Sequence, residues 1–136
     1  MQERGKPRWI WLIPTVMAVA IGCNERGRLT FPEPDDGMGP TTLIDVPAGS
    51  DTTVPAGPGF FVYGRAIDPD GIDSVNFLVT NEVFPPFLPS PQSDTVQFAL
   101  PITTFGHPGD TILVQIYSVD THGNRGGTSV RRIFVQ

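Results

Sequence analysis

The sequence has few charged residues, a single cysteine and no long hydrophobic run, and each shortage excludes a class of protein. Only 17% of the 136 residues are charged, and 14 acidic residues outnumber 9 basic ones. This balance argues against a nucleic-acid-binding protein, which needs a basic surface. One cysteine permits neither an internal disulfide nor a cysteine-based zinc site. The longest uncharged apolar run, residues 9–22, has 14 residues, and a membrane-spanning helix needs about 20.

Glycine and proline are in excess, with 15 of each. Both residues interrupt helix interiors, so this composition argues against a helical bundle. Hydrophobic residues make up 39% of the chain, enough for one core, and the length fits one domain.

The N-terminal segment has the pattern of a secretory signal peptide. Residues 1–8 carry three basic residues against one acidic, residues 9–22 are apolar, and small residues end the run. The tetrapeptide Ala20-Ile21-Gly22-Cys23 resembles the lipobox of bacterial lipoproteins, although Leu is usual where Ala20 stands. The resemblance implies that residues 1–22 are removed and that Cys23 is acylated on its thiol and on its new amine. The alternative is an uncleaved N-terminal anchor.

Acylation at Cys23 would decide where the protein resides. Two or more acyl chains anchor a protein stably, whereas one chain is marginal. Residues 23–136 carry 6 basic and 13 acidic residues, a net charge of −7, so lipid and not a basic patch would hold the protein at an anionic membrane. We therefore expect a lipid-anchored protein of the bacterial cell envelope. Asn24 follows the cysteine where Asp is the usual inner-membrane retention signal, so the resemblance implies the outer membrane in a Gram-negative organism.

A flexible tether and one β domain are expected after the cysteine. Residues 24–40 hold three glycines and three prolines without apolar periodicity, so we assign residues 23–40 to the acylated cysteine and the tether. From residue 41 onward, apolar and polar residues alternate in short runs between turn sequences, which is typical of half-buried strands. We expect strands at residues 42–46, 60–67, 72–80, 94–100, 111–119 and 129–135. This spacing predicts an all-β antiparallel sandwich over residues 41–136.

The last of these strands breaks the alternation. Val130 and Ile133 cannot share a face of a regular strand, because two arginines separate them. We expect a β-bulge between Arg131 and Arg132 to restore the register.

The order of residues in the domain resembles that of bacterial immunoglobulin-like domains. The residues that carry the resemblance are Ala66, Asp68, Gly71, Ile72, Val75 and Phe77 in the first half and Ser118, Asp120, Gly123 and Asn124 in the second. The resemblance covers residues 41–136 and implies an immunoglobulin-like antiparallel β-sandwich of about seven strands. The cysteine pair and the third-strand tryptophan of antibody domains are missing, so Phe77 is expected to take the tryptophan position.

Acidic loops are the first candidate site. Asp68, Asp70 and Asp73 lie between the second and third expected strands, and Asp120 and Asn124 lie between the last two. In an immunoglobulin-like sandwich these two loops emerge at the same end. Asp68, Asp70, Asp120 and Asn124 could then converge on a Ca²⁺ ion, which takes six to eight oxygen ligands. The alternative is that they are turn residues bonded to their own backbone, with no cofactor at all.

A proline-rich insert is the second candidate. Residues 84–91 contain four prolines, which forbid a central strand. Phe84, Phe87 and Leu88 could form an exposed apolar patch for a protein partner. The alternative is that the insert folds its phenylalanines down and covers an edge of the sandwich.

The sequence holds no nucleophile, base or phosphate-loop constellation that would indicate an enzyme. We expect a non-enzymatic lipoprotein whose immunoglobulin-like domain serves binding or structural support in the envelope. The alternative is a glycan-binding or enzyme-accessory module at the cell surface. Such a module needs a row of exposed aromatics, for which Phe61, Tyr63 and Tyr117 are the outward candidates.

Overall fold

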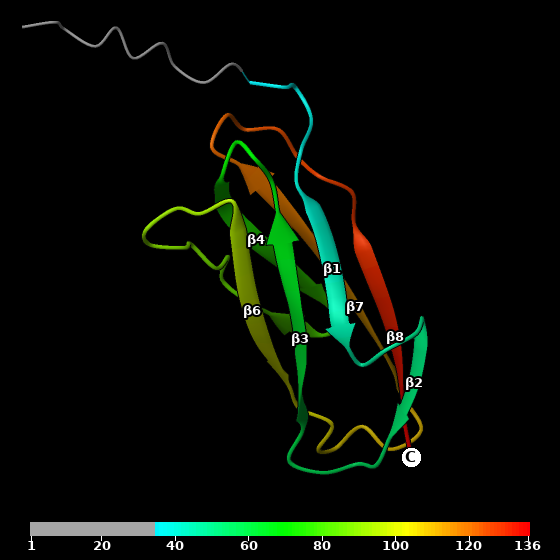
Figure 1. The fold of residues 1–136 in the computed structure, drawn as a ribbon. Helices are drawn as coiled ribbons and strands as arrows, with labels where there is room; N and C mark the ends of the chain where they lie inside the picture. Colours follow the sequence, from blue (N-terminus) through cyan, green and yellow to red (C-terminus); the bar gives the residue numbers. More distant parts are fainter. Residues whose placement is uncertain (1–34) are drawn as a thin grey trace, which may run out of the picture. The chain divides into compact units, whose positions relative to one another are not determined.

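The computed structural model describes residues 35–136, so the predicted signal peptide, Cys23 and most of the predicted tether lie outside the described residues. Every regular element of the described part is a β-strand (Figure 1). The strands are β1 (Thr41–Val46), β2 (Asp51–Val54), β3 (Phe60–Ile67), β4 (Ile72–Val79), β5 (Glu82–Val83), β6 (Thr95–Ile102), β7 (Thr111–Asp120) and β8 (Ser129–Val135). In this part of the chain, no helix is long and apolar enough to cross a membrane.

The strands form two sheets that pack face to face. One sheet has the order β1-β3-β6 and the other β2-β8-β7-β4-β5, and the three-stranded sheet lies in front in Figure 1. Every pairing is antiparallel except that of β2 with β8, which is parallel. The predicted all-β immunoglobulin-like sandwich is confirmed, with β2 and β5 as strands that the sequence pattern did not reveal.

Alternation along the strands builds the core. Every second residue of β6 and β7 is buried, and the partners that β7 meets on β4 point inward with it. The buried set on these strands includes Val75, Val79, Val96, Phe98, Leu100, Ile112, Val114 and Ile116. Phe77 packs against this core at half burial, edge-on to Phe98 with ring centroids 5.6 Å apart. The predicted inward faces of β4, β6 and β7 are therefore confirmed.

The predicted bulge in β8 is wrong. β8 pairs with β7 in unbroken register from Ser129 to Phe134, and Val130 points outward at 41% exposure. Arg131 points inward instead: Nε donates to the Pro47 carbonyl at 3.0 Å and Nη2 to the Ile44 carbonyl at 2.7 Å. An arginine can occupy this inward position because its stem packs on apolar atoms while its guanidinium reaches backbone acceptors.

Residues 35–40 lie against the domain although they belong to the predicted tether. Pro40 is fully buried, and Gly126 lies so close to the Pro40 carbonyl that no Cβ would fit there. The backbone N–H of Asp36 donates to Asp70 Oδ2 at 3.1 Å. This segment therefore reaches the loops at the end of the sandwich where β1 begins.

Candidate functional site

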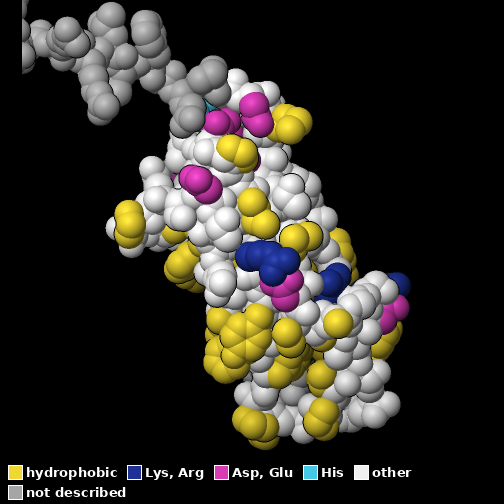
Figure 2. All heavy atoms as spheres, viewed as in Figure 1, with side chains coloured by type: hydrophobic (Ala, Val, Ile, Leu, Met, Phe, Trp, Pro, Cys, Tyr) yellow, Lys and Arg dark blue, Asp and Glu magenta, His cyan; other side chains and the backbone are white. Residues whose placement is uncertain are grey.

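An acidic group occupies the end of the sandwich that carries the β3–β4 and β7–β8 loops. One ligand atom from each of Asp35, Asp70, Asp120 and His122 lies within 4.8 Å of the others. Figure 2 shows acidic side chains gathered at this end of the molecule. We call these four residues, together with Asp68, the acidic apex.

Hydrogen bonds within the loops hold Asp120 at the centre of the apex. Its Oδ1 accepts from the backbone N–H groups of His122 and Asn124, both at 2.8 Å, and its Oδ2 accepts from Asn124 Nδ2 at 2.8 Å. Asn124 Nδ2 also donates to Asp35 Oδ1 at 2.9 Å. In the other loop, Asp68 Oδ1 accepts from the Asp70 N–H at 2.8 Å. These are the side-chain-to-backbone bonds that turn-forming Asp and Asn residues make.

Folding shifts the pKa values of the two buried carboxylates of the apex in opposite directions. Burial raises the pKa of Asp68, which is 4% exposed, and the nearby charge of Asp120 adds to the effect of burial, while the Asp70 N–H opposes it. Burial would also raise the pKa of Asp120, but the hydrogen bonds from Asn124 and His122 outweigh it and bring this pKa below its ordinary value. Donors aimed at a carboxylate stabilise its charged form, and desolvation destabilises it.

Four predicted ligands lie at this end, but not as one set. Asp70 and Asp120 belong to the acidic group, Asn124 bridges it through hydrogen bonds, and Asp68 is buried beside it. Asp73 is exposed on β4 and stands outside the group. Asp35 and His122 also belong to the acidic group, and they were not among the candidate ligands predicted from the sequence.

Chemically, the apex offers carboxylate oxygens and one imidazole to a hard cation. No arginine among the described residues forms an ion pair with these carboxylates. Every buried polar side-chain atom in residues 35–136 nevertheless has a hydrogen-bond partner within the protein. The described geometry is therefore satisfied by turn contacts alone.

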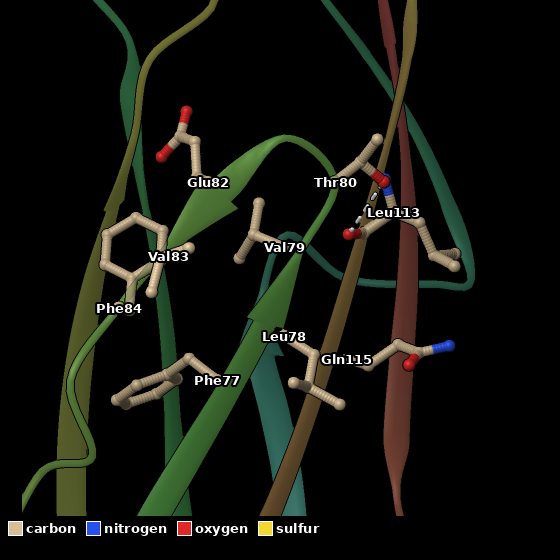
Figure 3. Close-up of a pocket in the computed structure, with 9 residues that line it drawn as sticks. All are labelled: Phe77, Leu78, Val79, Thr80, Glu82, Val83, Phe84, Leu113 and Gln115. Atoms are coloured by element: carbon tan, nitrogen blue, oxygen red, sulfur yellow. Dashed lines mark hydrogen bonds between the residues drawn. The ribbon is translucent and has the colours of Figure 1, made fainter.

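The proline-rich insert follows β5 and borders an apolar groove. Phe84 packs partly buried against the core, while Phe87 and Leu88 are 43% and 65% exposed. The backbone of Phe87 exchanges two hydrogen bonds with Val75, of 2.8 and 2.9 Å. Figure 3 shows the Phe77 and Phe84 rings pointing to the same side of the β4–β5 hairpin. The insert thus packs Phe84 against the core and leaves Phe87 and Leu88 exposed.

Exposed aromatic side chains lie on the outer face of the three-stranded sheet. Phe61 and Tyr63 on β3 are 50% and 47% exposed, with ring centroids 5.8 Å apart and planes tilted by 30°. Arg65 follows on the same face and pairs with Asp45 at 3.2 Å. Figure 2 shows hydrophobic side chains gathered on this face beside a basic and an acidic group. Tyr117 lies elsewhere, under the Arg125 guanidinium at 3.8 Å, so only two of the three aromatic candidates form a row.

Comparison with known proteins bears on the fold. No protein-family model matches the sequence, and no curated protein is significantly similar to it in sequence. Two crystal structures of the SrpA adhesin of Streptococcus sanguinis, one of them a mutant, superpose with TM-scores of 0.52 and 0.51 at 16% and 14% identity. The matches cover 75% and 76% of this chain but only 57% and 60% of the adhesin chains. Fibronectin(III)-like modules of Clostridium thermocellum CbhA match 71% of this chain and 96% of theirs, at 18% identity and a TM-score of 0.43. At these identities the adhesin matches support the sandwich fold and nothing more specific.

Proposed function

We propose that this chain is a non-enzymatic lipoprotein of the bacterial envelope, in which an immunoglobulin-like domain binds a partner at the cell surface. The observation that carries the binding role is the apolar outer face of the three-stranded sheet. Leu43, Phe61, Tyr63 and Ile67 all point outward there and are at least 38% exposed. Apolar side chains grouped on one face of a soluble domain mark interaction surfaces. The lipobox resemblance at Cys23 supports the anchored part of the proposal.

Membrane fractionation of cells that express the chain tests the anchoring. The wild-type protein is expected in the membrane fraction and to enter the detergent phase. The Cys23→Ser variant is expected to accumulate as the unprocessed precursor, because it has no thiol to acylate. Equal processing and equal partition of the two proteins would contradict the proposal.

A glycan is the second candidate partner, and the Phe61–Tyr63 row favours it. Two neighbouring rings on a sheet face offer an apolar platform, and Arg65 and Asp45 supply polar groups beside it. Retardation in native gels that contain soluble polysaccharides measures such binding. Tyr63→Ala should abolish the retardation. Phe105→Ala removes a ring that is 78% exposed on the β6–β7 loop and serves as the matched control.

For the acidic apex we infer a structural role, since its carboxylates already bond to backbone N–H groups. A Ca²⁺ ion held by Asp68, Asp70, Asp120 and Asn124 is the alternative. Thermal melts with millimolar Ca²⁺ or Mg²⁺ separate the two. Equal shifts indicate screening of like charges, whereas a rise with Ca²⁺ alone that Asp70→Ala abolishes would establish a calcium site.

A further inference from the structure

The outer edges of the two sheets are protected to different degrees. A strand at the edge of a sheet presents unpaired backbone groups, and proteins protect them with charges, prolines, short strands or covering side chains. At the β1 edge, Ser129 Oγ donates to the Thr42 carbonyl and Arg131 Nη2 to the Ile44 carbonyl. These two inward side chains of β8 therefore cover the β1 edge.

The two edges of the five-stranded sheet are also protected. β2 is four residues long, carries the Asp51–Arg132 ion pair at 2.8 Å and runs directly into Pro55. β5 is two residues long, and Pro85 and Pro86 follow it closely. Neither edge offers a long row of backbone donors.

The β6 edge differs in length and in charge. β6 has eight residues, TVQFALPI, and none of them is charged. It pairs with β3 on one side and ends the sheet order on the other. Four prolines in residues 84–91 keep the preceding segment from pairing there as a further strand.

Register fixes which backbone groups of β6 point outward. β3 and β6 pair in regular register up to Ile67 opposite Thr95, so Asp68 and Asp94 are the next opposing pair. The Asp68 N–H donates to the Asp94 carbonyl at 2.8 Å, which makes this a hydrogen-bonded pair. Even-numbered residues of β6 therefore bond to β3, and odd-numbered ones direct their N–H and C=O groups outward. Pro101 is consistent with this assignment. It is an odd-numbered residue, and proline has no backbone N–H, so the pairing with β3 loses no donor there.

Outward N–H groups thus belong to Thr95, Gln97 and Ala99. The Thr95 N–H makes a long bond of 3.4 Å to Ser93 Oγ. No described residue bonds to the N–H groups of Gln97 and Ala99. We call residues 95–101 of β6 the open edge.

An apolar groove lies beside the open edge, between β6 and the insert. A cavity of about 300 Å³ separates β6 from the insert, and its apolar lining includes Phe84, Phe87, Phe98 and Leu100. A strand added at the open edge would point alternate side chains into this groove. A second copy of β6 could not do so, because its own inward side chains are buried in its own core.

We propose that the open edge docks an extended peptide segment of a partner protein by antiparallel strand addition. Apolar side chains of the segment fill the groove, and its backbone pairs with Gln97 and Ala99. Residues 35–136 carry four arginines against eleven acidic residues, a net charge of −7, and Asp94 directly precedes the edge. Lysine or arginine at the ends of the segment therefore strengthens binding at low salt. This inference deepens the proposed binding role and rests on it.

The probe is a fluorescein-labelled peptide, Lys-Val-Thr-Val-Thr-Val-Lys, titrated with the full chain in detergent and followed by fluorescence anisotropy. The side chains of odd-numbered β6 residues lie on the solvent-facing side of the sheet. In an antiparallel pair, a peptide residue that is hydrogen-bonded to one of these residues places its own side chain on that same side. The threonine nitrogens therefore pair with the edge while the valines enter the groove. N-methylation of the threonine nitrogens should abolish binding, and N-methylation of the valine nitrogens should leave it unchanged.

Matched variants test the edge from the protein side. Ala99→Pro removes one outward N–H without touching a bond to β3 and should weaken binding by about tenfold or more. Thr53→Pro places the same residue at an outward position of β2 and should leave binding unchanged.

Three results would overturn the proposal. They are no binding, equal binding of the threonine-methylated peptide, and a wild-type dimer in analytical ultracentrifugation that Ala99→Pro dissociates. The last result would assign the edge to a second copy of the chain. Membrane fractionation tests the anchoring and the polysaccharide gels test glycan binding, each without the peptide probe, so failure here is distinguishable from failure of the proposed function.

Discussion

Replacing Asp120 with alanine is the perturbation with the most specific expected outcome. Asp120 is 1% exposed, and its carboxylate accepts three hydrogen bonds of 2.8 Å, two from backbone N–H groups and one from Asn124 Nδ2. The alanine variant leaves those three donors without their acceptor, while the backbone hydrogen bonds of the β7–β8 loop remain.

The magnitude follows from the kind of bond that is lost. A hydrogen bond to a charged group contributes about 1.5–3 kcal/mol, and the loss is smaller where water can replace the acceptor. His122 is exposed and Asn124 is half-buried, so both are partly rehydrated in the variant. We expect Asp120→Ala to lower the free energy of unfolding by about 2–4 kcal/mol. Asp70→Ala, which loses one exposed bond from the Asp36 N–H, should cost less than about 1 kcal/mol.

The direction of each pKa shift predicts how the carboxylate's contribution to folding stability changes with pH. The pKa of Asp120 is lowered by folding, so the unfolded chain binds the proton more tightly. The stabilisation is therefore present above the ordinary Asp pKa and is lost as the pH falls through the lowered one. The pKa of Asp68 is raised, mainly by burial, so its contribution is present at low pH and is lost as the pH rises through the raised value. Asp68→Asn should therefore increase stability at neutral pH and bring little gain in acid.

Urea denaturation at neutral pH and at about pH 3 measures both effects. The deficit of Asp120→Ala should shrink in acid, and the gain of Asp68→Asn should shrink as well. A deficit of Asp120→Ala equal to that of Asp70→Ala, or unchanged between the two pH values, would refute the assigned role of Asp120.

Four further changes test the packing by urea denaturation. Ile116→Ala, at a fully buried position of β7, should cost about 2–5 kcal/mol, and Phe77→Ala should cost less because Phe77 is only half-buried. Arg131→Met keeps the apolar stem but removes the bonds to two β1-side carbonyls, so it should cost about 1–3 kcal/mol, and an unchanged midpoint would argue against this contact. A chain of residues 33–136 should be more stable than one of residues 41–136, because only the longer chain contains the buried Pro40; equal stability would show that residues 33–40 add nothing.

The strands could be predicted from the sequence because a half-buried strand alternates apolar and polar residues. Ile112, Val114 and Ile116 alternate with less buried residues, and the structure buries all three on one face of β7. Short edge strands carry no such pattern. β2 was missed because Asp51 and its two following threonines are polar, and β2 is held by its parallel pairing with β8.

Arg131 and Asp35 show where local pattern fails. The bulge prediction assumes that Val130 shares the inward face with Ile133, whereas Val130 points outward and Arg131 takes the inward position, where it reaches the Ile44 and Pro47 carbonyls. Asp35 joins the apex only because residues 35–40 lie along the domain, 89 residues before Asn124 in the chain. Contacts of this range depend on the assembled fold and leave no local signal.

The most direct test of the proposed lipid anchor is the intact mass of the protein extracted from the membranes of cells that process lipoproteins. We predict a chain that begins at Cys23, contains the 114 residues 23–136 and carries the added mass of a diacylglyceryl group and of an acyl chain on the new amine. A mature protein that retains Met1, begins at another residue or carries an unmodified Cys23 would contradict it.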